Sequence, residues 1–182
     1  MNRKIIIVAL IGIVVVGGYI TFRVLSSRPL SPAQTITYNY NGLDLKLVYC
    51  RPFKKGRLIF GDEKAGALVP NNKYWRLGAN EATEISLTKD VSVAGKPLKA
   101  GSYRVYAVPG EMSWEISFNS ELGAWGYNEP DSTKDVLKVN VPVEKVSSEM
   151  EQFTITFSQD PAGVNMNLDW DKTHLRVPIS AQ

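Results

Sequence analysis

The sequence has only one cysteine and one histidine among its 182 residues. A single cysteine excludes an internal disulfide framework and a cysteine-rich zinc site, and a single histidine excludes a metal centre built on several histidines. The acidic residues also lack the spacing of a calcium loop, so we expect no metal and no cofactor. There is no G-x-S-x-G motif and no phosphate-cradling glycine loop. These absences exclude several common enzyme classes.

An excess of charge of one sign is also missing from most of the chain. The formal net charge is +3, from 21 basic and 18 acidic residues. Arg3, Lys4 and Arg23 flank an apolar run, and all acidic residues follow residue 26, which leaves 18 basic against 18 acidic residues in the remainder. A neutral domain is not a polybasic nucleic-acid binder, because phosphate binding needs a net basic face. We therefore expect no nucleic-acid partner.

The apolar run covers residues 5–22, with no charged residue in 18 positions. A helix of this length spans roughly 27 Å, which is just enough for a hydrocarbon core of about 30 Å. We predict a cytoplasmic N-terminus over residues 1–4 and a transmembrane signal anchor over residues 5–22, in a single-pass inner-membrane protein whose domain faces the periplasm. A cleaved secretory signal is the alternative, although no A-x-A-like cleavage site follows the run.

The rest of the chain divides into a linker and one folded domain. Residues 23–34 are rich in serine and proline, which is typical of a short semi-rigid linker. Over residues 35–182, apolar and polar residues alternate with period two, as at Leu43, Leu45 and Leu47, in short segments bounded by turn residues. Nine or ten such segments and no amphipathic helix predict an all-β fold, an antiparallel β-sandwich of jelly-roll-like kind.

Two stretches are too irregular for strands. Residues 60–82 and 119–134 are rich in glycine and asparagine, yet they contain Trp75, Trp125 and Tyr127. Long loops with large aromatic side chains either pack onto the core or form a binding surface. Both interpretations stay open at the level of sequence.

Several motifs together point to one family. The longest are Y-C-R-P-F-K-K-G-R-L-I-F-G over residues 49–61 and W-R-L-G-A-N-E-A-T over residues 75–83, followed by W-E-I-S-F-N, L-G-A-W-G and D-V-L-K-V. With these motifs the chain resembles the uncharacterised bacterial envelope family called domain of unknown function 2911, over most of residues 45–158. The resemblance implies a secreted or membrane-anchored β domain and no established reaction. It also implies that a thiol is dispensable, because the family more often has serine at the position of Cys50.

The first candidate site is basic. Four basic side chains lie within seven residues, at Arg51, Lys54, Lys55 and Arg57. Guanidinium groups that converge could clamp a carboxylate, sulfate or phosphate, because their planar forks match such anions. The alternative is a solvated loop whose charges pair with carboxylates nearby in the sequence, at Asp62, Glu63 or Glu81.

The second candidate site is the W-R-L-G-A-N-E-A-T segment. An aromatic ring beside an arginine, an amide and a carboxylate is the set that sugar-binding sites use, here Trp75, Arg76, Asn80 and Glu81. The alternative is a structural role, in which a buried ion pair between Arg76 and Glu81 holds the loop. Gly78 and Asn80 are expected at positive φ.

The function that we predict is binding of a ligand or partner, either a glycan or an envelope protein. The candidate ligand-binding residues are Arg51, Lys55, Arg57, Trp75, Arg76, Asn80 and Glu81. One alternative is a carboxylate-dependent glycan-active hydrolase, which needs two facing carboxylates. Another is a purely structural subunit of an envelope assembly, with an exposed patch that includes Trp125 and Tyr127. We assign no catalytic residue, and we expect Cys50 to be an ordinary strand residue and His174 a turn residue.

Overall fold

The computed structural model describes residues 12–13, 16–19 and 31–181. Residues 12–13 and 16–19 are helical, and no helix among the described residues is long and apolar enough to cross a membrane. The predicted cytoplasmic N-terminus over residues 1–4 lies outside the described residues, as do most of the predicted anchor and linker. Residues Ser31–Gln182 are one compact unit of the chain and form the folded domain.

Nine antiparallel strands in the described part of the chain form one sheet, in the order β1-β2-β5-β8-β9-β10-β11-β6-β7. Their bounds are Ala33–Tyr40 (β1), Leu43–Cys50 (β2), Thr83–Leu87 (β5), Val91–Val93 (β6), Lys96–Leu98 (β7), Gly101–Val108 (β8), Ser113–Asn119 (β9), Asp135–Asp160 (β10) and Gly163–Ala181 (β11). The irregular stretches contain a short parallel pair and two 3₁₀ turns: Phe60–Gly61 (β3), Val69–Pro70 (β4), Glu63–Ala65 (η1) and Ser132–Lys134 (η2). The predicted all-β antiparallel fold is confirmed, and its first strand starts inside the predicted linker.

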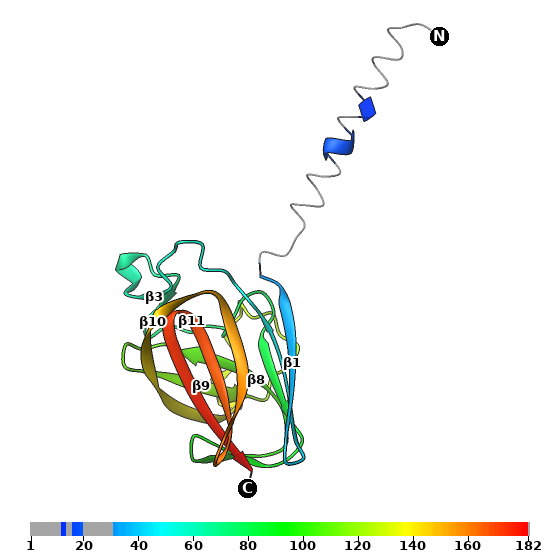
Figure 1. The fold of residues 1–182 in the computed structure, drawn as a ribbon, viewed down its shortest axis with the longest axis vertical. Coiled ribbons are helices and arrows are strands. Elements are labelled where there is room, and N and C mark those ends of the chain that lie inside the picture. The colour runs from blue at the N-terminus through cyan, green and yellow to red at the C-terminus, as the bar shows by residue number, and fades with distance from the viewer. Residues whose placement is uncertain (1–11, 14–15, 20–30, 182) are drawn as a thin grey trace, which may run out of the picture. The chain divides into compact units, whose positions relative to one another are not determined.

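The long strand β10 folds the sheet over on itself (Figure 1). Its first part pairs with β9, and from Val143 onward it pairs with β11. Register shifts on either side of Met150 interrupt the second pairing. Such irregularities bend a strand and increase its twist, so one chain segment serves both parts of the sheet. Strands β8 to β11 follow one another in chain order as a meander, which corrects the jelly-roll-like order expected from the sequence, because a jelly roll is built from Greek keys.

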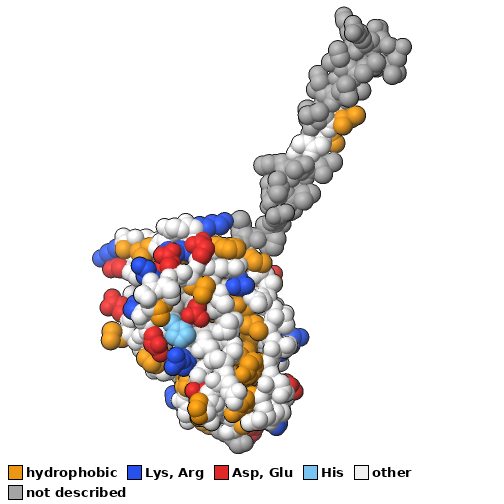
Figure 2. All heavy atoms as spheres, in the orientation of Figure 1, with side chains coloured by type: hydrophobic (Ala, Val, Ile, Leu, Met, Phe, Trp, Pro, Cys, Tyr) orange, Lys and Arg blue, Asp and Glu red, His pale blue; other side chains and the backbone are white. Residues whose placement is uncertain are grey.

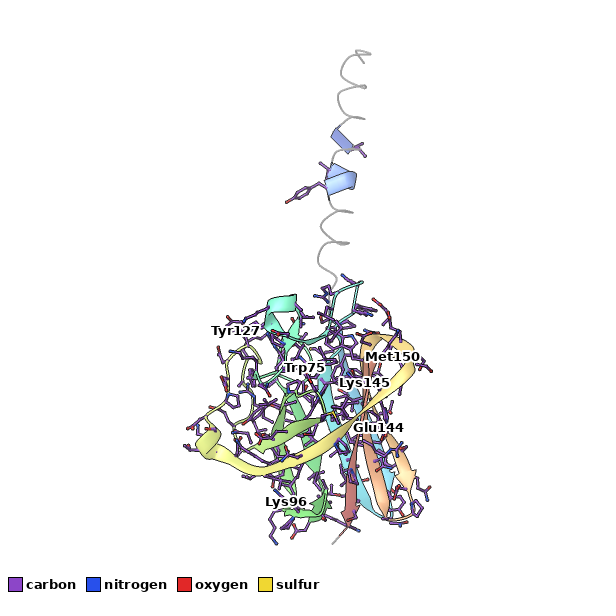
Figure 3. The ribbon with its side chains drawn as sticks, turned by 90° about the vertical axis from the view of Figure 1, so that its left-hand side faces the viewer. Trp75, Lys96, Tyr127, Glu144, Lys145 and Met150 are labelled. Carbon is purple, nitrogen blue, oxygen red and sulfur yellow. The ribbon has the colours of Figure 1, made fainter. Side chains whose placement is uncertain are left out.

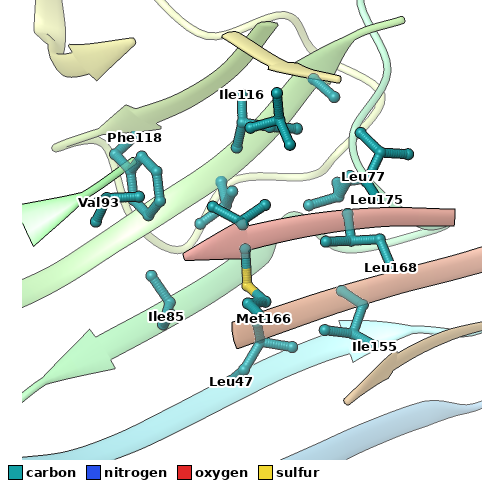
Figure 4. Close-up of a cluster of buried hydrophobic side chains, with 14 of the residues drawn as sticks. Leu47, Leu77, Ile85, Val93, Ile116, Phe118, Ile155, Met166, Leu168 and Leu175 are labelled. Atoms are coloured by element: carbon teal, nitrogen blue, oxygen red, sulfur yellow. The ribbon is translucent and has the colours of Figure 1, made fainter. Parts of the chain in front are cut away.

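The core lies against the inner face of this folded sheet (Figure 4). The period-two pattern of each strand determines which side chains enter the core. In β2, Leu43, Leu45 and Leu47 are at most 1% exposed, whereas the residues between them are exposed. The core also contains a cluster of aromatic rings, at Tyr49, Trp75, Trp114, Phe153 and Trp170. Their edge-to-face and stacked contacts add to the stabilisation that comes from burial alone.

The outer face of β8 and β9 is buried as well. Alternation places Tyr103, Val105 and Ala107 of β8 in the core, so Arg104 and Tyr106 are on the outer face. Arg104 is nevertheless only 1% exposed and Tyr106 only 4%. The outer face is therefore covered by other segments of the chain, which creates a second, polar interior.

Candidate functional site

The guanidinium groups of the basic loop bind the protein itself. Arg51 donates from Nε to the Phe153 carbonyl at 3.1 Å and from Nη2 to Thr154 Oγ1 at 2.7 Å. Arg57 donates from Nε to the Lys54 carbonyl at 2.9 Å and from Nη2 to the Phe53 carbonyl of the same loop. Because the two side chains hold different parts of the fold, they do not converge on a shared anion site, and the expected clamp is corrected to a structural role.

The lysines of this loop also have partners. Lys54 Nζ forms ion pairs with Glu149 at 2.8 Å and Asp171 at 2.7 Å. Lys55 is exposed, and its backbone N–H donates to Glu151 Oε1 at 2.9 Å. Within the described residues, Lys54 alone of the four basic side chains is ion-paired, and its partners lie in β10 and β11. The pairing that we expected with Asp62, Glu63 or Glu81 does not form.

Trp75 is a core residue. Its side chain is 6% exposed, and its indole Nε1 donates to the Gly78 carbonyl at 3.2 Å. Figure 3 shows Trp75 inside the domain. The indole contacts four other rings at centroid distances of 5.0–5.8 Å, namely Phe60, Trp114, Phe153 and Trp170. A sugar cannot stack on a ring that is enclosed in this way, so the role expected for Trp75 is corrected to core packing.

The residues after Trp75 have an unusual backbone. Leu77 and Asn80 both have a φ of 54°, although Leu77 is fully buried, and such a conformation is uncommon for a bulky residue. Gly78 has a φ of 150°, and a Cβ at this position would lie 2.6 Å from the Cys50 carbonyl oxygen. The prediction of positive φ at Gly78 and Asn80 is confirmed. These conformations let the segment pass directly over the end of β2.

Arg76 and Asn80 connect this segment to residues 119–134. The Arg76 guanidinium lies over the Tyr127 ring at 5.6 Å, and its Nη1 makes a long 3.5 Å hydrogen bond to the Asn80 carbonyl. The Gly126 N–H donates to that same carbonyl at 3.0 Å. Within residues 31–181, no ion pair joins Arg76 to Glu81, so the buried pair considered from the sequence does not form.

Glu81 instead accepts a hydrogen bond from the Cys50 thiol, with Sγ and Oε2 3.1 Å apart. Bonds from its own backbone N–H and from this thiol lower the pKa of Glu81. Burial, followed by the bond to Glu81 and its charge, raises the pKa of Cys50. The carboxylate thus stays ionised and the thiol stays protonated, so Cys50 is not an activated nucleophile.

The two irregular stretches lie side by side. Glu81 and Trp125 form an isolated antiparallel bridge, and the Ala82 N–H donates to the Ala124 carbonyl at 3.3 Å. The Tyr74 hydroxyl donates to the Gly126 carbonyl at 2.8 Å. The segment 119–134 is therefore fixed to the rest of the domain at several points along its length.

This pairing leaves two aromatic rings on the outside. Trp125 is 50% exposed and Tyr127 is 73% exposed, and Figure 3 shows Tyr127 at the periphery of the domain. Arg76 and Glu81 lie beside them, through the ring contact of Arg76 with Tyr127 and the bridge of Glu81 with Trp125. We call these four residues the loop surface. Of the candidates named from the sequence, Arg76 and Glu81 both lie here, and the Asn80 carbonyl accepts hydrogen bonds from Arg76 and Gly126.

A buried polar cluster underneath was missed by sequence reasoning. It consists of Tyr74, Arg104, Tyr106, Asn119 and Asp135. Arg104 donates from Nη2 to the Tyr74 hydroxyl at 2.7 Å, and Asn119 Nδ2 donates to Asp135 Oδ1 at 2.8 Å. A charged residue at an outer position of a strand is usually solvated, so alternation alone gives no signal of this burial. The signal that the sequence does carry is the long stretch after β9, whose large aromatic side chains allow it to pack onto the rest of the domain.

Tyr106 has the most strongly shifted pKa of this cluster. Its hydroxyl donates to Asp135 Oδ2 at 2.7 Å. Burial, and then the hydrogen bond to the carboxylate, raise the pKa of Tyr106 to about 12. The phenol therefore remains protonated at neutral pH and acts as a fixed hydrogen-bond donor.

No cluster of three or more His, Cys, Asp or Glu side chains suited to a metal ion occurs among the residues described. His174 lies in β11, which corrects the expected turn position, and its Nδ1 is 2.7 Å from Asp169 Oδ1. On the face seen in Figure 2, basic and acidic side chains are interspersed rather than separated.

Together, fold and site define an all-β antiparallel domain in which two paired loops carry an aromatic surface above a buried polar cluster. Residues 31–179 match the family model described as "Protein of unknown function (DUF2911)", and the chain therefore belongs to this family. No curated protein and no solved structure matches the chain.

Proposed function

We propose that this chain is a membrane-anchored envelope domain, a β-sandwich that binds a glycan through the loop surface. The observation that carries the proposal is the exposure of Trp125 and Tyr127, at 50% and 73%, on a segment that is held in place by hydrogen bonds. Large exposed rings on a fixed backbone favour recognition, because little conformational freedom is lost when a ligand binds.

The neighbouring polar groups favour a glycan. A ring offers a flat apolar face to a sugar, and charged and amide groups orient its hydroxyls. Arg76 lies over the Tyr127 ring, and the exposed Glu81 is bridged to Trp125. The loop surface thus combines rings with hydrogen-bonding groups of both kinds, a donor and an acceptor.

A protein partner is the second candidate. Leu122, in the same segment, is 46% exposed, which extends the apolar part of the surface. Trp, Tyr and Arg are also the residue types that dominate binding energy at protein interfaces. An envelope protein docking on this surface, in a structural assembly, is therefore the alternative that the experiment must separate.

The hydrolase alternative has less support. A glycosidase acid needs a raised pKa, so that it is protonated near neutral pH. The pKa of Glu81 is lowered instead, and Glu84 Oε1 accepts the Gly123 N–H at 2.7 Å as a loop anchor. Glu81 therefore does not fit the role of a general acid, and Glu84 anchors a loop, which is why we favour binding over catalysis.

The location is part of the proposal. We propose that residues 5–22 anchor the chain in the inner membrane, with residues 1–4 in the cytoplasm and the domain in the periplasm. The test is N-terminal sequencing of the mature protein together with alkaline carbonate extraction of membranes. A chain that begins near residue 26 and is released by carbonate would show a cleaved signal instead.

Tryptophan fluorescence tests the binding site directly. The chain has four tryptophans, of which Trp75, Trp114 and Trp170 are at most 6% exposed. Acrylamide quenching in the full chain, kept in a non-ionic detergent, therefore reports mainly on Trp125. A panel of neutral and acidic polysaccharides is added, and a ligand on the loop surface is expected to reduce the quenching.

Two variants control this measurement. Trp125→Phe should abolish the ligand-dependent protection and weaken binding in a pull-down. Met112→Ala is the matched control, because Met112 is 83% exposed and lies at the other end of β9 from the 119–134 segment. If no polysaccharide protects Trp125, while an envelope protein crosslinks to the loop surface, the glycan proposal is replaced by the protein alternative.

A further inference from the structure

The Arg104 guanidinium is buried without a close counterion. Its side chain is 1% exposed, and its Nη2 donates to the Tyr74 hydroxyl and the Asn128 carbonyl, both uncharged groups. Its Nε has no hydrogen-bond partner among the described residues. A buried charge is costly unless it is paired and fully hydrogen-bonded, so this arginine is incompletely satisfied.

The nearest carboxylate is held loosely. Glu121 Oε2 is 4.0 Å from Arg104 Nη1, whereas a charge-assisted hydrogen bond is about 2.7–2.9 Å long. The other oxygen of Glu121 is 3.4 Å from Lys134 Nζ, and the Glu121 side chain is 35% exposed. Glu121 is therefore a partly exposed carboxylate that faces Arg104 Nη1 at long range and shares its charge with Lys134.

We propose that Arg104 and Lys134 form a carboxylate-binding site that Glu121 occupies in the free protein. An incoming carboxylate displaces that of Glu121 and pairs with Arg104 Nη1, with Lys134 at the rim. The ligand class is an acidic glycan, in particular one with uronic acid residues. This inference rests on the proposed function and specifies the ligand for it.

The position of the site explains the choice of ligand. Asn128, whose carbonyl accepts from Arg104, is adjacent in the chain to Tyr127 of the loop surface. A uronic acid unit has an apolar ring face and a carboxylate on the same small ring. It can therefore contact an exposed aromatic ring and an anion site that lie close together, which a neutral sugar cannot do.

The experiment uses two probes that share one sugar backbone and differ in whether the carboxylates are free or methyl-esterified. Oligomers of galacturonic acid and their fully methyl-esterified forms share one backbone, and the ester removes the carboxylate charge. Dissociation constants are measured on the full chain in non-ionic detergent, through protection of Trp125 from acrylamide. We expect the acid to bind at least tenfold more tightly than the ester.

Glu121→Gln is the decisive variant. It removes the competing carboxylate at a partly exposed position, so folding is not threatened. We expect roughly two- to fivefold tighter binding of the acid, the range set by a partly exposed ion pair, and unchanged binding of the ester. Glu115→Gln is the matched control, because Glu115 is 37% exposed and pairs with Lys138 at 3.6 Å. This control should leave both constants unchanged.

A second variant connects the effect to Arg104. Arg104→Lys in the Glu121→Gln background keeps the charge but shortens the reach and removes the planar fork, so the gain for the acid should disappear. The inference is overturned if Glu121→Gln leaves the constant for the acid unchanged, if it improves the ester equally, or if the double variant keeps the gain. If a neutral glycan protects Trp125 and the acid does not, this inference fails while the proposed function stands. If no glycan protects Trp125, both fail.

Discussion

Replacing Trp75 by alanine tests whether this tryptophan is a core residue and not part of a sugar-binding surface. The structure places this indole in the core at 6% exposure, against four other rings, whereas Trp125 is 50% exposed. The two tryptophans come from similar irregular stretches of the sequence. Comparing Trp75→Ala with Trp125→Ala therefore isolates the effect of tertiary burial.

The expected magnitude follows from the contacts. Truncating a buried aromatic side chain to alanine costs about 3–5 kcal/mol. Losing the hydrogen bond from Nε1 to the Gly78 carbonyl adds about 1 kcal/mol, because the carbonyl is left without its donor. Trp75→Ala should therefore lower the free energy of unfolding by about 4–6 kcal/mol, and Trp125→Ala by less than about 1 kcal/mol.

The assay is equilibrium unfolding in urea at 25 °C, followed by far-ultraviolet circular dichroism on the full chain. Since a typical domain has only about 5–15 kcal/mol of stability, Trp75→Phe serves as a second variant that keeps a ring and should lose about 1–2 kcal/mol. A loss below about 2 kcal/mol for Trp75→Ala, or equal losses for both alanine variants, would refute the assignment of Trp75 to the core.

Three further predictions concern the backbone, a tyrosine and the thiol. Gly78→Ala should destabilise by about 1–3 kcal/mol more than Gly56→Ala in urea unfolding, because an added Cβ at Gly78 meets a backbone oxygen at 2.6 Å whereas one at Gly56 meets no atom within 4 Å. Tyr106 has a pKa of about 12 in the folded domain, above the value of 10.0 for an unfolded chain. Its contribution to the free energy of unfolding is therefore complete below pH 10 and is lost between pH 10 and 12. Across that pH range, the urea midpoint of unfolding should fall less steeply in Tyr106→Phe than in the unchanged protein. Cys50 is 3% exposed with a raised pKa, so a thiol reagent should label the folded chain far more slowly than the urea-unfolded chain, and equal rates would contradict its burial.

The fold class was predictable because one face of each strand is apolar. The alternation at Leu43, Leu45 and Leu47 directly reports which side chains point inward, and the structure buries these three. The order of the strands was not predictable, because local alternation carries no information about which strands pair. The placement of β6 and β7 beside β11, and the continuity of β10 through its bend, depend on contacts between distant segments.

The candidate site was predicted only in part. The sequence singled out the segment that contains Arg76 and Glu81, and the structure places these two residues beside the exposed rings. It could not tell Trp75 from Trp125, because burial of a loop residue depends on what the loop packs against. It also expected local ion pairs for the basic loop, whereas Lys54 reaches Asp171, which the fold brings near from a distant part of the sequence.

The all-β class, the inward face of the alternating strands, the family motifs and the apolar run over residues 5–22 can all be read from the amino-acid sequence. These follow from local periodicity and composition, which act over a few neighbouring residues. Contacts between distant segments, in contrast, enclose Trp75, leave Trp125 and Tyr127 facing outward, and bury Arg104 on the outer face of its strand. The physical reason is that period two distinguishes two faces of a sheet, while the burial of the second face depends on which distant segment covers it.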